Sequence, residues 1–385
     1  MKKKQIAILG STGSIGKTLL SVVDPKTIEI KLLSANKNYK NILKQAKIFK
    51  VKNLIIFNND SFKKAIKYNK NPNINIYNNL EILSKILKKK LDYVLSSISG
   101  IDGLIPTFKI IKFTKKIAIA NKESLICGWL FIKRELDKNK VKFVPVDSEH
   151  FTIWQEINKI NPNDIKKIYL TASGGPLLKY NFHYIKKVSM SKVLKHPNWQ
   201  MGKKISVDSA TMMNKCYELI EAKNIFNLSY KQLDILVHPD SYAHSLIVYK
   251  NSLIKLIFHE TNMKIPIFNS LYDNKRIYKK DVAVDLKKMN KLNLHQINKI
   301  KFPIVEVLKD LPKHYSLFET VLVTVNDNIV NDYLNKKIKF HEISKKVLKL
   351  INLNKFKKYK KRLPKDINEI IKLNNKINLE ISKIN

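Results

Sequence analysis

The first third of the chain alternates short apolar runs with longer amphipathic stretches. The apolar runs cover residues 5–9, 28–33, 53–57, 93–98 and 116–120. Lysine-rich stretches of helical spacing, such as residues 80–91, lie between them. Strands that alternate with helices predict an α/β fold with a Rossmann-like, doubly wound parallel sheet. We expect this first domain to cover residues 1–146.

The pattern changes from residue 147 onward. Between residues 147 and 274, segments rich in Ser, Gly, Pro, His and Asn separate strands such as 167–170 and 252–258. This pattern predicts an α+β domain whose long loops carry a site. Residues 275–301 are expected to form a linker. Helical spacing returns in residues 302–385 and predicts a small helical C-terminal domain. A chain of 385 residues is too long for one ordinary core and suits two or three domains.

The chain is strongly basic. It has 73 Lys and Arg against 31 Asp and Glu, a formal net charge of +42, and all but Arg134, Arg276 and Arg362 of the basic residues are lysines. A protein that reads nucleic acid favours arginine forks and stacked aromatic rings at a defined place, whereas these lysines are spread along the whole chain. We therefore expect a solvated basic surface and no nucleic-acid partner, and a basic nucleic-acid binder is kept as the alternative.

The cysteines and the apolar runs indicate the compartment. Cys127 and Cys216 are the only cysteines, too few for a disulfide framework, which favours a reducing cytoplasm. The apolar run after the basic N-terminus is too short for a signal peptide, and no run approaches the length of a membrane span. We expect a cytoplasmic protein without a membrane partner.

A glycine turn follows the first expected strand. Gly10, Gly13 and Gly16 form a G-x-x-G-x-x-G pattern that lets backbone N–H groups approach a pyrophosphate at a helix N-terminus; a plain tight turn is the alternative. The second strand ends in Ser-Ala-Asn-Lys-Asn at 34–38, without the carboxylate typical of NAD binders. The ammonium of Lys37 could bind a 2′-phosphate, which favours NADP over NAD. The alternative is that Lys37 is simply one of the many surface lysines.

Carboxylates follow the strand that ends the first domain. Asp147 and Glu149 stand two residues apart, on the same side of an extended chain, and Glu218 can add a third carboxylate from a helix. Oxygen ligands suit a hard divalent ion such as Mg²⁺ or Mn²⁺. Solvated or helix-capping carboxylates are the alternative.

Two serine-rich segments can hold a phosphate. Residues 171–176 (TASGGP) and 206–211 (SVDSAT) offer hydroxyls and backbone amides, to which Asn214 and Lys215 add an amide and a cation. Ordinary loops with helix caps are the alternative. Between the two segments, Trp199 lies in HPNWQMG (196–202). A tryptophan in a loop with Pro and Gly suits a lid that closes over substrate and excludes water. A tryptophan packed in the core is the alternative.

Taken together, these segments resemble the 1-deoxy-D-xylulose 5-phosphate reductoisomerase family. The matching stretches are GSTGSIG at 10–16, ANKESLICG at 120–128, PVDSEH at 145–150, LTASGGP at 170–176, HPNWQMGKKISVDSATMMNK at 196–215 and HPDSYAHS at 238–245. The resemblance implies NADPH-dependent rearrangement and reduction of 1-deoxy-D-xylulose 5-phosphate to 2-C-methyl-D-erythritol 4-phosphate, in the methylerythritol phosphate pathway of isoprenoid precursor biosynthesis. It also implies a homodimer and a flexible lid.

The resemblance assigns roles to individual residues. It implies a divalent ion (Mg²⁺, Mn²⁺ or Co²⁺) on Asp147, Glu149 and Glu218, and catalytic roles for Lys122, Glu149 and His196. The implied substrate contacts are Lys122, Ser148, Glu149, Ser173, His196, Ser209, Asn214, Lys215 and Glu218. The implied NADPH contacts are Thr12, Gly13, Ser14, Ile15, Asn36, Lys37, Asn38, Asn121, Glu123 and Gly202.

The chain departs from the family pattern at two places. Asn36 stands where the family often has Gly, which bears on the backbone near the adenosine phosphate. Asn326-Asp327 stands where the family usually has Asn-Glu in an alanine-rich helix, which bears on the packing of the last domain. A further alternative is a family member that has lost its catalytic activity. The complete set of carboxylates argues against this alternative.

Overall fold

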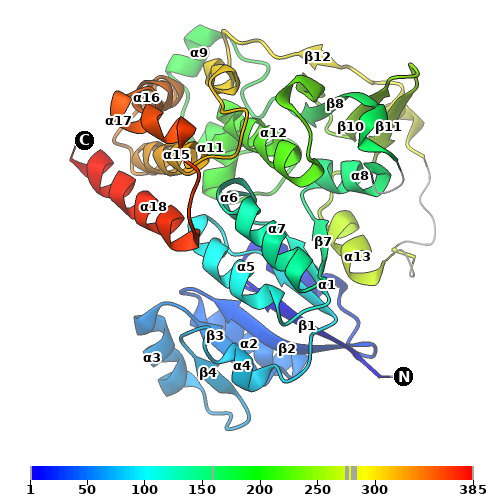
Figure 1. Cartoon of the computed structure of the whole chain (residues 1–385), viewed down its shortest axis with the longest axis vertical. Coiled ribbons are helices and arrows are strands. Elements are labelled where there is room, and N and C mark those ends of the chain that lie inside the picture. Colours follow the sequence, from blue (N-terminus) through cyan, green and yellow to red (C-terminus); the bar gives the residue numbers. More distant parts are fainter. Residues whose placement is uncertain (1, 158–159, 274–276, 279–283, 384–385) are drawn as a thin grey trace. The chain divides into compact units, whose positions relative to one another are not determined.

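The chain divides into two compact units. The structure is a computed structural model that describes residues 2–157, 160–273, 277–278 and 284–383 (Figure 1). The first unit comprises Met1–Ser124, Gly128–Asp147 and Met263–Lys280, and the second comprises Leu125–Cys127, Ser148–Asn262 and Asp281–Asn385. Among the described residues, no helix has both the length and the apolar character that crossing a membrane requires.

The first unit is built on a parallel sheet of seven strands in the order β4-β3-β2-β1-β5-β6-β7. The strands are β1 (Lys4–Leu9), β2 (Ile28–Ala35), β3 (Asn53–Ile56), β4 (Asn75–Tyr77), β5 (Tyr93–Ser96), β6 (Lys116–Ile119) and β7 (Lys142–Pro145). The helices are α1 (Ser14–Val22), α2 (Tyr39–Phe49), α3 (Asn59–Tyr68), α4 (Leu83–Ile86), η1 (Ile101–Gly103), α5 (Leu104–Ile111), α7 (Trp129–Lys138) and α13 (Lys264–Tyr272), with α6 (Lys122–Cys127) shared between the units. The predicted Rossmann-like sheet is confirmed.

The apolar runs become strands because the sheet buries them. Ile6, Ala7, Ile8 and Leu9 are completely buried, as is typical of parallel strands covered on both faces. The strand order reverses at β1, which lies between β2 and β5. In such sheets, ligands bind outside the carboxyl ends of the strands at this reversal, where the glycine turn begins.

Helix α13 joins the first unit although the sequence analysis assigns its residues to the catalytic domain. The Tyr93 hydroxyl lies 2.9 Å from Ser270 Oγ, and Lys116 Nζ donates to the Ser270 carbonyl at 2.5 Å and to Asp273 Oδ1 at 2.6 Å. Burial lowers the pKa of Lys116 to about 8. These buried polar contacts fix α13 to strands β5 and β6, an attachment that no local pattern encodes.

The second unit contains a mixed sheet in the order β11-β10-β8-β9-β12, in which β8 and β9 are parallel and the other pairs antiparallel. The strands are β8 (Ile165–Ala172), β9 (Leu233–Val237), β10 (Ala243–Tyr249), β11 (Ile254–Phe258) and β12 (His295–Gln296). Its other elements before residue 317 are α8 (Ser148–Ile157), η2 (Pro162–Asp164), α9 (Phe182–Lys186), α10 (Met190–Leu194), α11 (Lys203–Thr211), α12 (Met213–Phe226), η3 (Tyr230–Gln232), α14 (Leu286–Met289) and η4 (Pro303–Lys309).

The expected linker at 275–301 lies partly outside the described residues. Its described part contains α14 and also β12, where His295 pairs with Val237 and Gln296 with Leu236 of β9. The C-terminal region is helical, as predicted, with α15 (Phe318–Leu334), α16 (Glu342–Ile351), α17 (Asn354–Lys357), η5 (Lys358–Lys361) and α18 (Ile367–Ser382). Helix α15 packs against α16, α18 and α11 (Figure 1).

Candidate active site

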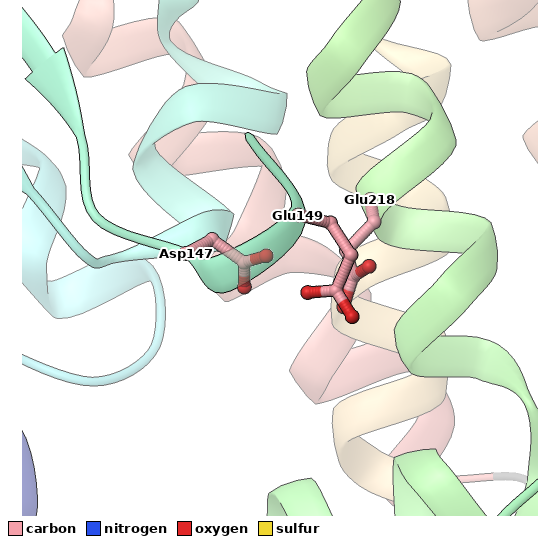
Figure 2. Close-up of side chains that lie close together, drawn as sticks. All are labelled: Asp147, Glu149 and Glu218. Atoms are coloured by element: carbon pink, nitrogen blue, oxygen red, sulfur yellow. The ribbon is translucent and has the colours of Figure 1, made fainter. Parts of the chain in front are cut away.

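Three carboxylates that are far apart in the sequence meet in the structure. Asp147 follows β7, Glu149 lies in the first turn of α8, and Glu218 lies in α12. One oxygen from each lies within 4.8 Å of the others, and Figure 2 shows the three groups converging. Glu218 is buried, whereas Asp147 and Glu149 are half-buried. The cluster thus presents several oxygen atoms in a small volume, which is the donor set that a hard divalent cation prefers.

Two lysines balance the charge of this cluster. The Lys122 ammonium pairs with Asp147, and the Lys215 ammonium pairs with Glu218 and lies 3.1 Å from Glu149 Oε1. With three carboxylates and two ammonium groups, the formal charge of the group is −1 when all are ionised. Asn214 Nδ2 also donates to Glu218 Oε1 at 2.5 Å. Buried carboxylates need such partners, because an unpaired buried charge is costly.

His150 holds the helices that carry two of the carboxylates. Its Nε2 donates to the main-chain oxygen of Glu218 at 2.9 Å, and its Nδ1 lies 3.5 Å from Glu221 Oε2. The imidazole is completely buried, so it joins α8 to α12 within the core. The sequence analysis gives His150 no role; its only signal is the position next to Glu149.

His196 and Ser173 form a hydrogen-bonded pair with a defined proton arrangement. The amides of Asn198 and Trp199 both donate to His196 Nδ1, at 3.1 and 3.0 Å, so the ring proton lies on Nε2. Nε2 lies 3.0 Å from Ser173 Oγ, which also accepts from the Gly175 amide at 3.0 Å. The Ser173 hydroxyl proton is therefore available to another acceptor.

Burial, and secondarily the positive charge of Lys215, lowers the pKa of His196 to about 4. The imidazole is therefore neutral at physiological pH. A neutral ring keeps the single N–H that the arrangement with Ser173 requires.

A rigid turn connects Ser209 with Lys215. Helix α11 ends at Thr211 and is capped by Met212, whose backbone is left-handed with a φ of 73°, and α12 begins directly after this residue. The Ser209 carbonyl accepts from the Met212 amide at 3.2 Å, and the Met212 carbonyl accepts from the Lys215 amide at 3.1 Å. Gly175 packs so closely that a Cβ there would lie 2.8 Å from the Ser209 carbonyl oxygen. The loop of Ser173 therefore adjoins the helix of Ser209.

Asn198 attaches the segment around Trp199 to the residues that follow β9. Asn198 Nδ2 donates to the Pro239 carbonyl at 2.7 Å and to Ser241 Oγ at 3.0 Å. Trp199 is half-buried, and its ring lies edge-on to His244 with 6.4 Å between centroids. His244 in turn stacks on His259 at 3.7 Å, a residue that the sequence analysis did not single out. The lid role of Trp199 stays a prediction.

In the first unit, the glycine turn has the close approaches that require glycine. Gly10 has a φ of 82°, and a Cβ on Gly16 would lie 2.5 Å from the Gly10 carbonyl oxygen. Of the expected contacts, Ser14 and Ile15 begin α1, Gly13 is its N-cap and Thr12 precedes the cap, which makes no side-chain hydrogen bond. Amides at such a helix start suit a phosphate.

The other expected NADPH contacts lie at strand ends and at a helix start. Asn36, Lys37 and Asn38 are exposed after β2, where Asn38 caps α2. Asn121 is buried and donates to the Ile98 and Gly100 carbonyls at 2.6 and 2.9 Å and to Glu123, so its side chain fixes the loop after β5. Gly202 is the exposed N-cap of α11 in the second unit.

Comparison with known proteins gives one consistent result. The profile described as 1-deoxy-D-xylulose 5-phosphate reductoisomerase matches residues 6–128, and the two that describe C-terminal domains of this enzyme match residues 143–226 and 259–378. A curated protein of that name from Pelagibacter ubique is 51% identical over 385 residues, with 99% of each chain covered. One from Clostridium tetani is 39% identical over 355 residues, covering 89% of this chain and 90% of the relative.

Solved structures agree with these matches. A crystal structure of DOX-P reductoisomerase in complex with NADPH, fosmidomycin and magnesium has a TM-score of 0.89 at 28% identity and covers 97% of this chain and 96% of its own. The Zymomonas mobilis 1-deoxy-D-xylulose 5-phosphate reductoisomerase in complex with NADPH has a TM-score of 0.86 at 27% identity, with 100% and 99% covered.

Proposed function

This chain belongs to the 1-deoxy-D-xylulose 5-phosphate reductoisomerase family, and we propose how its own residues carry out the reaction of that family. It is an NADPH- and divalent-metal-dependent oxidoreductase that converts 1-deoxy-D-xylulose 5-phosphate to 2-C-methyl-D-erythritol 4-phosphate in isoprenoid precursor biosynthesis. The observation that carries the residue assignment is the convergence of Asp147, Glu149 and Glu218 within 4.8 Å.

The carboxylate cluster fits a divalent metal ion. All three donors are oxygens, and the group keeps a net negative charge after its two lysines are counted, which suits Mg²⁺, Mn²⁺ or Co²⁺. The ion supplies a Lewis acid that neutralises charge developing on the oxygens of the sugar. Asp147, Glu149 and Glu218 hold it, and Lys122, next to Asp147, is a further cation beside the reacting end of the substrate.

The substrate phosphate is held by the serine loops and Lys215. Ser173 has a hydroxyl proton to donate, and Ser209, Asn214 and Lys215 are linked through the turn at Met212. These groups suit a phosphate monoester, and binding it orients the sugar at the carboxylates. Ser148 extends the polar surface next to Glu149, to which its hydroxyl donates at 2.5 Å. Neutral His196 keeps Ser173 in this donor role.

All proposed NADPH contacts except Gly202 belong to the first unit. The start of α1, with Thr12, Gly13, Ser14 and Ile15, takes the pyrophosphate, and Lys37 with Asn36 and Asn38 takes the 2′-phosphate. Asn121, Glu123 and Gly202 complete the proposed contacts. The cofactor supplies the hydride that reduces the rearranged aldehyde.

The direct test is NADPH oxidation by the purified protein with 1-deoxy-D-xylulose 5-phosphate, with and without Mg²⁺ or Mn²⁺. We expect turnover only when substrate and metal are both present. Glu149→Gln serves as the site variant, and Glu156→Gln, in the same helix but paired with exposed Lys255, serves as its control. Absence of turnover by the wild-type protein with metal would reject the function, and equal activity of the two variants would reject the carboxylate assignment.

We also propose a cytoplasmic homodimer. Both cysteines are buried and neither forms a disulfide bond, which suits a reducing compartment. Strand β11 is an edge of its sheet; Ile254, its first residue, is 62% exposed, and the preceding Leu253 is 64% exposed. An apolar edge strand is suited to pairing with a second copy. Light scattering after gel filtration should give a dimer mass that Ile254→Lys lowers and Leu379→Lys, at an equally exposed position on α18, does not; a monomeric wild type would refute this.

A further inference from the structure

A buried carboxylate on α11 connects the C-terminal helices to the phosphate site. Asp208 is 2% exposed, and Asn326 of α15 is completely buried. Asn326 Nδ2 donates to Asp208 Oδ1 at 2.8 Å. This orientation of the amide is fixed by chemistry, because a carboxylate only accepts hydrogen bonds and the Asn326 oxygen could not donate.

The second oxygen of Asp208 is also paired. Lys204 Nζ lies 2.9 Å from Asp208 Oδ2 and 2.9 Å from Asp327 Oδ1, so the ammonium joins α11 to α15 a second time. The same ammonium lies 5.2 Å from the centroid of the Tyr217 ring on α12. Both carboxylate oxygens of Asp208 thus have a partner. The two links from α11 to α15 end at neighbouring residues, Asn326 and Asp327.

This arrangement continues to the turn that sets the phosphate site. The Asp208 carbonyl accepts from Thr211 Oγ1 at 3.2 Å, and Thr211 Oγ1 accepts from the Met213 amide at 3.3 Å. Met213 begins α12, directly after left-handed Met212, and the Met212 backbone bonds both Ser209 and Lys215. A non-glycine residue in this conformation costs about 1 kcal/mol or more and persists only where its surroundings enforce it.

We propose that Asn326 is a positioning residue for substrate phosphate: through Asp208 it holds α11 and the Met212 turn so that Ser209 and Lys215 face the same anion. The inference rests on the proposed phosphate role of Ser209 and Lys215. It extends the site to α15, a helix that contains none of the proposed substrate contacts. Asn326 itself does not touch the substrate. Its amide determines how the two ends of the turn are aligned.

The chain offers a matched control on the same helix. Asn328, two residues later in α15, donates from Nδ2 to the Thr324 carbonyl at 2.8 Å and to Asn378 Oδ1 of α18 at 2.6 Å. Asn326→Ala and Asn328→Ala therefore each remove an inter-helix amide bond of α15. Only the first removes a bond to α11.

The test compares wild type, Asn326→Ala and Asn328→Ala in the full-length enzyme. Isothermal titration with inorganic phosphate, in the presence of Mn²⁺, measures the phosphate site without requiring turnover. We expect Asn326→Ala to weaken phosphate binding about tenfold, the size of one lost charge-assisted hydrogen bond, and to raise the KM for the sugar phosphate similarly while the Kd for NADPH is unchanged. Asn328→Ala should bind phosphate as the wild type does.

Rescue distinguishes positioning from general damage. In the double variant Asp208→Asn with Asn326→Asp, the amide lies on α11 and the carboxylate on α15, so one hydrogen bond can form in the opposite direction. This variant should recover most of the phosphate affinity that either single change loses. Unchanged phosphate affinity in Asn326→Ala, or equal losses in the two alanine variants, would overturn the proposal. If Asn326→Ala does not fold, Asp208→Asn and the double variant give the same comparison. A wild type that binds phosphate but lacks turnover would reject the proposed function and leave this comparison valid.

Discussion

Replacing Lys215 with methionine tests the charge balance of the carboxylate cluster. The ammonium pairs with Glu218 and lies 3.1 Å from Glu149 Oε1, and the side chain is only 7% exposed. At an effective dielectric constant of about 20, the attraction across 3.1 Å is about 5 kcal/mol before desolvation is subtracted. Removing one partner of a buried ion pair costs about 3–5 kcal/mol, because the other charge is left in the interior.

The expected outcome depends on metal. Without divalent ions, Lys215→Met should lower the free energy of unfolding of the second unit by about 3–5 kcal/mol. A divalent cation replaces the missing positive charge, so Mn²⁺ should bind the variant more tightly than the wild type and narrow this stability difference. At a free Mn²⁺ concentration of about 100 times the Kd, the ion contributes about 2.7 kcal/mol. Urea unfolding with and without Mn²⁺ measures the difference, and isothermal titration measures the Kd.

A surface lysine provides the control. Lys167 Nζ lies 3.2 Å from Asp234 Oδ2, a similar distance, but the two side chains are 27% and 56% exposed. Lys167→Met should change the unfolding free energy by no more than about 1 kcal/mol, with no dependence on metal. If Lys215→Met binds Mn²⁺ no more tightly than the wild type, the inferred competition between ammonium and metal is refuted, whatever happens to stability.

Three further predictions concern turnover, pH and cofactor choice. Glu149→Gln should lower turnover by orders of magnitude while NADPH, followed by fluorescence titration, still binds; near wild-type turnover would contradict this. The pKa of His196 is lowered to about 4, so the unfolded chain binds a proton that the folded chain does not, and stability should fall as pH drops from about 6.5 to 4. His196→Gln should flatten this decline in thermal melts, and an unchanged slope would count against the buried neutral imidazole. Lys37→Glu should raise the KM for NADPH about tenfold or more with little effect on NADH, and equal effects on both would exclude the 2′-phosphate contact.

The sequence predicts strands β1, β2, β3, β5 and β6 of the first sheet well, because the sheet buries most of their residues and they are read as continuous apolar runs. The short edge strand β4, which is exposed to half-buried, has no such run and is not predicted. The sequence also does not predict α13 in the first unit, because the attachment depends on Ser270 and Asp273 meeting Lys116 across more than 150 residues. The two-residue strand β12 is equally invisible to a local pattern, since only its pairing with β9 makes it a strand.

The candidate site divides in the same way. Asp147 and Glu149 are two residues apart after a strand, so their proximity follows from local geometry. Glu218 joins them because α12 packs against α8, where buried His150 bonds the Glu218 carbonyl, and no spacing in the sequence reports that contact. The proton arrangement of His196 depends on two backbone amides of its own loop, whose direction no sequence pattern reports.

Lys215 connects the two halves of the proposed site. It follows the Met212 turn that places Ser209, and its ammonium pairs with Glu149 and Glu218, so in the proposed assignment one side chain serves both the phosphate and the carboxylates. On this proposal, a divalent ion on the carboxylates reduces their need for the ammonium, and a bound phosphate uses it. We therefore expect metal binding and phosphate binding to favour each other, each by the same factor. This charge sharing explains why a lysine with such limited exposure lies at the start of α12.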